Sequence, residues 1–180
     1  MAEKSKGNEN VCNIAVEKAL DETMRMCGVG SREKVIERLK CCEPCEMGYF
    51  RFYLIRYVTE CIISKIKGLR GIYLFGSTVC DGARLTSDMN VLLHVDKKDK
   101  ATGKLMDEVN GMLSEDYKSI LGLRCKDCFR LLDVHFITDK DVKAGTGMAR
   151  LLSSAQDPPM ALWRRKGGLC GLGDMECDAP

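Results

Sequence analysis

Residues able to bind a metal or a phosphate gather between two short apolar runs, Ile72–Phe75 and Val91–Leu93. Asp88 and Asn90 stand two positions apart where the second run begins. Residues two apart on a strand share a face, so both side chains are expected to point the same way. Two carboxylates in these positions would hold divalent cations beside phosphate groups, and here one of the two is an amide.

The turn that follows the first apolar run opens with Gly76-Ser77. Glycine permits close backbone approach and turns expose N–H groups, so this pair would bring N–H groups and a hydroxyl to triphosphate oxygens. In-line transfer of a nucleotidyl group also requires two divalent cations at the attacking and leaving oxygens. Magnesium takes oxygen ligands in near-octahedral geometry, so its carboxylates must converge from two strands.

Composition favours a soluble globular domain, with 45% hydrophobic and 30% charged residues among 180. The formal net charge of +2 gives no overall polyanion-binding signature and leaves a local basic patch open. The start of the chain is polar and no apolar run is long enough for a transmembrane helix, so no signal peptide or membrane association is expected. Eleven cysteines then fit reduced thiols in the cytoplasm, with the nucleus as the alternative.

Helices are expected to precede the first strand. Apolar residues from Ile14 to Met26 predict one that ends before Gly28, and Ser31 can cap a short second one. A long helix over 47–67 has apolar residues at three-and-four spacing, which predicts one buried stripe.

A charged loop over 97–102 and an amphipathic helix over 104–117 are expected after the second strand. Two β-like runs, 119–125 and 128–138, then flank Lys126-Asp127, and this spacing predicts a hairpin.

The order of these features resembles the nucleotidyltransferase palm of the DNA-polymerase-β-like superfamily, and more closely that of terminal uridylyltransferases and noncanonical poly(A) polymerases. LFGSTVCDGARLTSDMN has the family's order of Gly-Ser, a turn and Ser-Asp-x-Asp, without a gap and with Asn90 in the last position. LLDVHFITD, which contains Asp133, resembles the strand that carries the third aspartate. MARLLSSAQDPPMALWRR resembles the start of the family's next, helical domain.

The resemblance implies an α/β (α+β) fold, in which a small mixed sheet has helices on one face. It divides the chain into a helical N-terminal extension over 1–45, a palm domain over 46–140, the start of a truncated helical domain over 141–165 and a flexible tail over 166–180. In the family the helical domain supplies most base-selecting contacts, so its truncation removes much of the nucleotide pocket.

The resemblance also assigns roles to five residues. Asp88, Asn90 and Asp133 take the catalytic positions, with Asp88 and Asp133 as ligands of Mg²⁺ or Mn²⁺, and Gly76 and Ser77 meet the nucleotide phosphates. An amide oxygen at position 90 can ligate a cation but brings no negative charge. Beside two dications, that missing charge weakens binding by several kcal/mol at an effective dielectric of about 20. The centre is therefore predicted to be degenerate.

Three functions follow as hypotheses. The first is a non-catalytic palm that binds RNA, nucleotide or a partner protein; the second is an active metal-dependent enzyme that adds uridylate or adenylate to RNA 3′ ends; the third is a protein-interaction module. A palm without its helical domain is also expected to associate with itself or a partner, through Leu151, Leu152, Leu162 and Trp163.

Other reactive residues receive structural interpretations. The pairs Cys42-x-x-Cys45 and Cys125-x-x-Cys128 lie far apart in the sequence, so reduced thiols are expected there rather than zinc. His94 and His135 are expected to be packed or surface strand residues. The run Lys97, Lys98 and Lys100 is typical of a solvated loop, with a role in contacting RNA phosphates left open.

Overall fold

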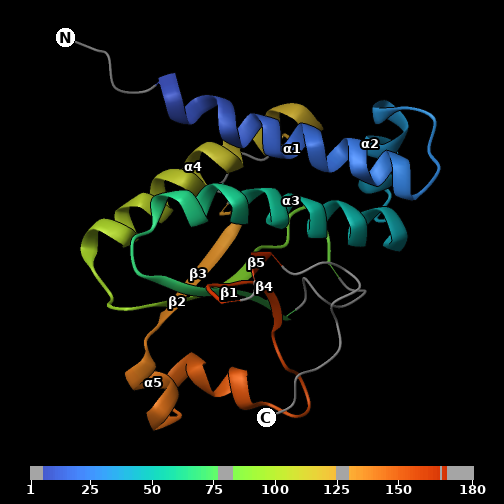
Figure 1. The fold of residues 1–180 in the computed structure, drawn as a ribbon. Helices are drawn as coiled ribbons and strands as arrows, with labels where there is room; N and C mark the ends of the chain where they lie inside the picture. The colour runs from blue at the N-terminus through green and yellow to red at the C-terminus, as the bar shows by residue number, and fades with distance from the viewer. Residues whose placement is uncertain (1–5, 77–82, 125–129, 167, 170–180) are drawn as a thin grey trace.

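A mixed β-sheet lies beneath a layer of long helices in the computed structural model (Figure 1). The structure describes residues 6–76, 83–124, 130–166 and 168–169, and it describes side chains from Cys12 to Lys166 within these ranges. The elements, in chain order, are α1 (Lys6–Met26), α2 (Arg32–Lys40), α3 (Pro44–Lys65), β1 (Leu69–Phe75), β2 (Met89–Val95), α4 (Lys100–Leu121), β3 (Leu132–Ile137), α5 (Asp139–Ala144), the 3₁₀ helix η2 (Gly147–Ser153), β4 (Met160–Arg164) and β5 (Gly168–Leu169). The predicted α/β class with a mixed sheet is confirmed.

The sheet has the strand order β3-β2-β1-β4-β5. β1 pairs antiparallel with both β2 and β4, and β4 pairs antiparallel with β5. β2 and β3 are parallel, and a parallel pair needs a crossover connection, which α4 supplies. As a result, the starts of β2 and β3 lie at the same end of the sheet as the end of β1.

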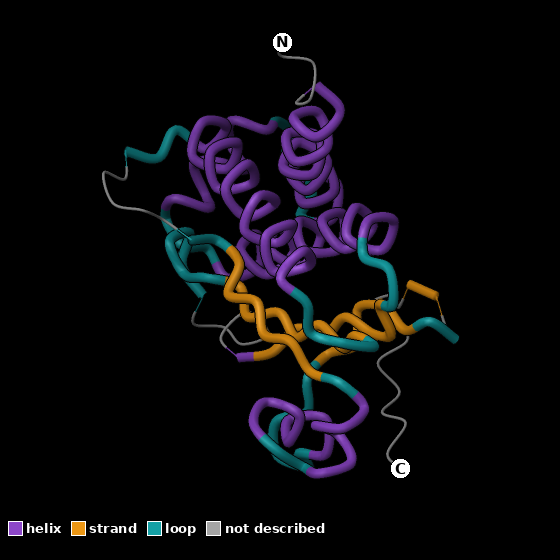
Figure 2. The backbone as a smooth tube through the Cα atoms, turned by 90° about the vertical axis from the view of Figure 1, so that its left-hand side faces the viewer, coloured by secondary structure: helices purple, strands orange, loops and turns teal. Residues whose placement is uncertain are grey.

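The long helices α3 and α4 cover one face of the sheet, and α1 packs against their outer side, as Figures 1 and 2 both show. The main apolar core lies between them and includes alternate residues of the central strands, such as Ile72, Val91 and Leu93. The short elements α5 and η2 lie against the opposite face, where a smaller cluster joins Tyr73 and Leu92 to Ala149 (Figure 2).

Helix α3 is central to this packing. Most of its predicted stripe is buried, although Tyr57 and Cys61 are half-buried. Arg51, Phe52 and Ile55 are buried on other sides of the helix, because α1 packs against it as well as the sheet does. The predicted cap of α2 is also confirmed, since the Ser31 hydroxyl accepts a hydrogen bond from the Lys34 N–H. No helix in the described ranges is long and apolar enough to cross a membrane.

The predicted hairpin around Lys126-Asp127 is wrong. Residues 119–121 continue α4, and β3 pairs parallel with β2 instead of antiparallel with a neighbouring strand. The helix also starts earlier than expected, within the predicted charged loop, because the Asp99 carboxylate caps it by accepting from the Thr102 N–H. Residues 125–129 lie outside the described residues.

The segment Met160–Arg164 forms strand β4, although the sequence resembled the start of a helical domain. β1 has one edge paired with β2, and Met160–Arg164 satisfies the other edge by pairing along it. Leu162 is consequently 2% exposed, so the prediction that it contributes to a bare apolar surface is wrong. The domain boundaries and the expected association stay predictions.

Candidate functional site

Two of the predicted site residues face each other across adjacent strands. Asn90 of β2 is the register partner of Asp133 of β3. On the other side Asn90 pairs with Phe75, the last residue of β1, and Gly76 follows directly. A Cβ atom on Gly76 would lie 3.0 Å from Asn90 Nδ2, and its φ of +72° is one that glycine adopts most readily. The end of β1 and the starts of β2 and β3 therefore meet around Asn90.

The site lies on the sheet face away from the long helices. Leu92 and Ile137 belong to the cluster under α5 and η2, and strand alternation places Asn90 and Asp133 on that same face. His135 lies beside them: its Nε2 is 3.0 Å from Asp133 Oδ2, and its ring centre is 5.7 Å from that of Phe75. One oxygen of the Asp133 carboxylate therefore already has a hydrogen-bonding neighbour.

Asp88 immediately precedes β2 and is exposed. Residues two apart in an extended segment share a side, and Asp88 stands two residues before Asn90. Ser77, the fifth predicted site residue, lies outside the described residues.

A buried arginine that the sequence analysis did not single out fixes the approach to β2. Arg51 of α3 is 1% exposed, and its guanidinium donates to the backbone carbonyls of Arg84 (3.1 Å), Ser87 (2.8 Å) and Asp88 (2.6 Å). Burial lowers the pKa of Arg51, although an arginine stays protonated in a protein. Tyr117 of α4 adds a hydrogen bond from its hydroxyl to the Leu85 carbonyl at 2.9 Å.

A buried asparagine likewise fixes the backbone at the start of β3. Asn110 of α4 is 4% exposed; its Nδ2 donates to the Leu132 carbonyl at 3.1 Å and its Oδ1 accepts from the Leu132 N–H at 2.9 Å. The Ser114 hydroxyl accepts from the Leu131 N–H at 3.2 Å. Asp133 follows Leu132 directly, so Asn110 and Ser114 determine where Asp133 enters the sheet. A lone arginine or asparagine on an otherwise apolar helix stripe is the signal that could have revealed both helix residues.

The donor set fits one hard cation better than two. Asp88 and Asp133 offer carboxylate oxygens and Asn90 offers an amide oxygen, which are the ligand types that Mg²⁺ and Mn²⁺ take. A two-cation centre would need more negative charge than two carboxylates supply, and one of these already interacts with His135.

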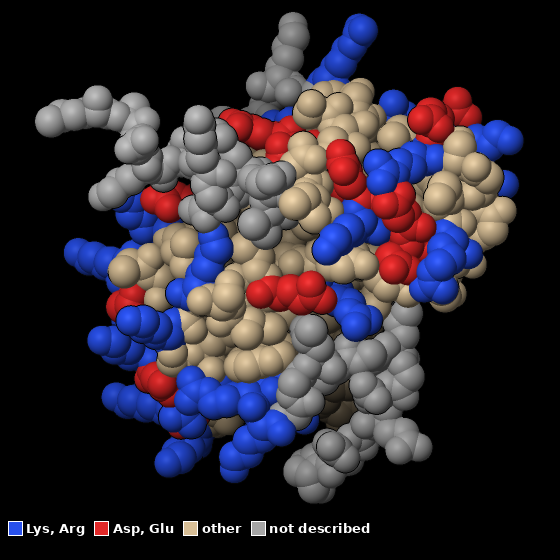
Figure 3. Space-filling model, turned by 45° about the horizontal axis from the view of Figure 1, so that its top comes forward, with Lys and Arg blue, Asp and Glu red and all other residues tan. Residues whose placement is uncertain are grey.

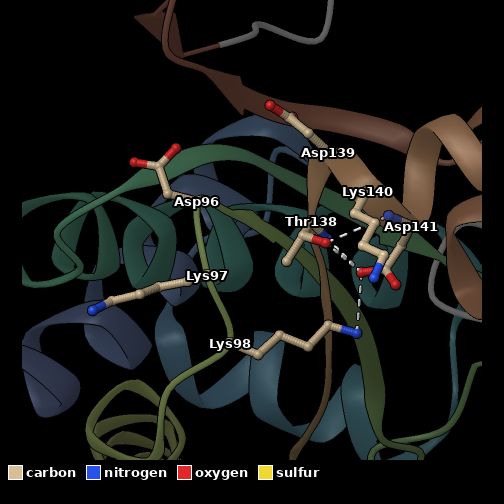
Figure 4. Close-up of a pocket in the computed structure, with 7 residues that line it drawn as sticks. All are labelled: Asp96, Lys97, Lys98, Thr138, Asp139, Lys140 and Asp141. Carbon is tan, nitrogen blue, oxygen red and sulfur yellow. Dashed lines mark hydrogen bonds and ion pairs between the residues drawn. The ribbon is translucent and has the colours of Figure 1, made fainter.

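A hollow of about 400 Å³ opens at the other end of β2 and β3, away from Asn90 and Asp133 (Figure 4). Its charges largely neutralise one another, because Lys98 Nζ lies 3.2 Å from Asp141, and Asp139 pairs with Arg70 (2.9 Å) and His94 (2.8 Å). The Thr138 hydroxyl and N–H both donate to Asp141, which lowers the pKa of that carboxyl to about 2. Thr138 and Asp141 form the N-terminal cap of α5. We therefore interpret the hollow as a structural feature of the fold.

Exposed lysines stand in the two segments that line this hollow and in the residues that follow them. Those that follow β2 and β3 are Lys97, Lys98, Lys100, Lys104, Lys140 and Lys143. Figure 3 shows Lys and Arg side chains collected along one side of the molecule, whereas basic and acidic side chains are mixed on the other side of the same view. These segments, 96–104 and 139–143, also contain Asp96, Asp99, Asp139 and Asp141, so their six lysines leave a local excess of two positive charges.

No protein-family model matches the chain, and no curated protein matches its sequence. Among solved structures it is similar to a crystal structure from Sulfolobus solfataricus, of a protein provisionally described as a nucleotidyltransferase. The two chains are 17% identical with a TM-score of 0.42, and the match covers 71% of this chain and 92% of the other. At that level of similarity, what one protein does says nothing about the other.

Proposed function

We propose that this chain is a nucleotidyltransferase palm of the terminal uridylyltransferase and noncanonical poly(A) polymerase type, with a degenerate centre, and that it binds RNA without transferring nucleotides. The observation that carries the proposal is the pairing of Asn90 with Asp133 on adjacent parallel strands, with Gly76 directly against Asn90. Asp88 lies two residues before Asn90, in the order that the palm pattern requires.

The topology supports the same assignment. A strand followed by Gly76 runs antiparallel to a strand preceded by Asp88, and a crossover helix then leads to a parallel strand bearing Asp133. This arrangement brings residues far apart in the sequence to one end of the sheet. Divalent cations would need carboxylates that converge from two strands in this way.

The charge of the site argues against turnover. Nucleotidyl transfer relies on two dications to stabilise the attacking and leaving oxygens. Asn90 supplies no charge, and the resulting deficit amounts to several kcal/mol at an effective dielectric of about 20. A single Mg²⁺ or Mn²⁺ held weakly by Asp88, Asn90 and Asp133 would neutralise a bound phosphate, while the second cation would lack ligands.

The exposed lysines favour RNA over a protein partner. Lysines that follow the strands can contact successive phosphates, and each contact adds salt-sensitive affinity. In contrast, the exposed apolar surface expected of an interaction module is small in the described part of the chain, where the large hydrophobic residues classed as exposed are Ile14, Met26 and Val142.

The test is one assay that reads both binding and extension of a fluorescent single-stranded RNA, with each nucleoside triphosphate and with Mg²⁺ or Mn²⁺. We expect salt-sensitive binding and no extension, both for the natural chain and for Asn90→Asp. Joint replacement of Lys97, Lys98 and Lys100 by glutamate should weaken binding about tenfold or more, since phosphate contacts are lost.

The matched control replaces Lys18, Lys34 and Lys40, exposed lysines of α1 and α2, by glutamate and changes the net charge equally. It should retain much more of the affinity. Extension of the RNA by the natural chain would contradict the non-catalytic assignment, and equal losses in the two triple variants would contradict the proposed RNA surface.

A further inference from the structure

Three possible metal ligands meet away from the sheet, where the end of α1 lies against the start of α3. Cys27 directly follows α1, and Cys45 and Glu46 lie in the first turn of α3. The Cys27 and Cys45 Sγ atoms are 3.5 Å apart, and these two sulfurs and a Glu46 carboxylate oxygen all lie within 4.8 Å of one another. The fold thus gives Cys45 a partner that the Cys42-x-x-Cys45 spacing did not suggest.

We propose that Cys27, Cys45 and Glu46 bind a thiophilic divalent cation, with Zn²⁺ as the biological occupant. Tetrahedral zinc with Zn–S bonds of about 2.3 Å places two ligand sulfurs about 3.8 Å apart, close to the 3.5 Å observed here. Cys45 is exposed, so water can complete the fourth position. This site is independent of the proposed RNA function, because it lies on the helical layer and uses a different ligand chemistry.

The charges of the three ligands, the cation and the neighbouring arginine balance one another. Two thiolates, one carboxylate and a dication sum to minus one, and the Arg38 guanidinium, 2.5 Å from Glu46 Oε1, brings the total to zero. Without a cation the same site disfavours a thiolate: burial, and then the hydrogen bond and charge of Cys45, raise the pKa of Cys27 to about 12. A bound dication reverses that preference, because a coordinated thiol loses its proton.

The cation would join α1 to α3, the helix that carries Arg51. The loop between Cys27 and Cys45 contains the whole of α2, and α3 carries Arg51 less than two turns after Cys45. A ligand that binds only the folded chain raises its stability, so zinc should stabilise the helical layer against unfolding.

The test is a Co²⁺ titration of the full chain under a non-thiol reductant, followed by displacement with Zn²⁺. We expect one Co²⁺ per chain, with the near-ultraviolet absorption of thiolate-to-cobalt charge transfer, and a higher melting temperature with Zn²⁺. Cys27→Ser and Cys45→Ser should each abolish this absorption, and Glu46→Gln should weaken binding about tenfold or more. Cys61→Ser, a half-buried thiol further along α3, should leave binding unchanged.

Circular dichroism of each variant establishes that it is folded before titration. Absence of the charge-transfer absorption in the fully reduced natural chain would overturn the proposal. Binding that survives Cys27→Ser but is lost in Cys42→Ser would identify the Cys42-x-x-Cys45 pair instead and would overturn it equally.

Discussion

Replacing Arg51 by methionine should lower the free energy of unfolding by about 3–5 kcal/mol. The methionine can fill much of the space, but the backbone carbonyls of Ser87 and Asp88 would lose a charged donor. The Arg84 carbonyl loses this donor too, but it still accepts from the Ser87 N–H at 3.0 Å. Each buried acceptor left unsatisfied costs about 1–3 kcal/mol, and removal of the buried charge offsets part of this. Urea unfolding followed by circular dichroism measures the difference.

Arg56→Met is the matched control, because Arg56 is on the same helix but is only half-buried. It should change stability by about 0.5 kcal/mol or less. Arg51→Lys should fall between the two, since an ammonium cannot reproduce the planar fork of the guanidinium. Similar losses for Arg51→Met and Arg56→Met would show that the carbonyl contacts contribute little.

Replacing Asn110 by leucine should cost about 2–4 kcal/mol. The Asn110 side chain forms hydrogen bonds with both the N–H and the carbonyl of Leu132. An apolar side chain of similar size would remove both hydrogen bonds. Because Asp133 is the next residue, the start of β3 should loosen as well. Urea unfolding gives the energy, and amide hydrogen exchange at Leu132 and Asp133 should become faster than in the natural chain.

Asn13→Leu in α1 makes the same chemical change at a half-buried position and should have little effect. A stability loss in Asn110→Leu without faster exchange at Leu132 would mean that Asn110 supports the core of α4 and does not position β3.

Local chemistry made part of the fold predictable. The Ser31 cap, the α3 helix and the two central strands depend on neighbouring residues or on short periodic patterns, and the structure contains all of them. The candidate site followed from spacing along those strands, and the register of Asn90 with Asp133 brings two of its residues together.

The errors arose where distant residues decide the outcome. Met160–Arg164 is apolar and short, and a strand and a helix cannot be told apart by periodicity at that length; the open edge of β1 decides for the strand. Residues 119–121 have β-like composition, but they continue α4, where Leu121 and Tyr117 are buried. Pairing β3 parallel to β2 needs the whole crossover, which a two-residue turn signal does not contain.

The supporting residues were missed for the same reason. Arg51 and Asn110 are distinguished by the backbone groups they meet, which lie 22 to 37 positions away in the sequence. Cys27 and Cys45 are 18 positions apart and meet only because α1 packs against α3. Such contacts become visible once the helices are placed.

The most direct test of the degenerate centre is a Mn²⁺ titration read by electron paramagnetic resonance of the free ion. The natural chain should bind Mn²⁺ weakly, and Asn90→Asp should bind it about tenfold tighter or more, because a negative charge is restored beside the cation. Asp133→Asn should abolish the binding, whereas Glu37→Gln, the same loss of one carboxylate at an exposed position of α2, should not change it. Equal affinities for the natural chain and Asn90→Asp, or binding that persists in Asp133→Asn, would contradict a metal site at these residues.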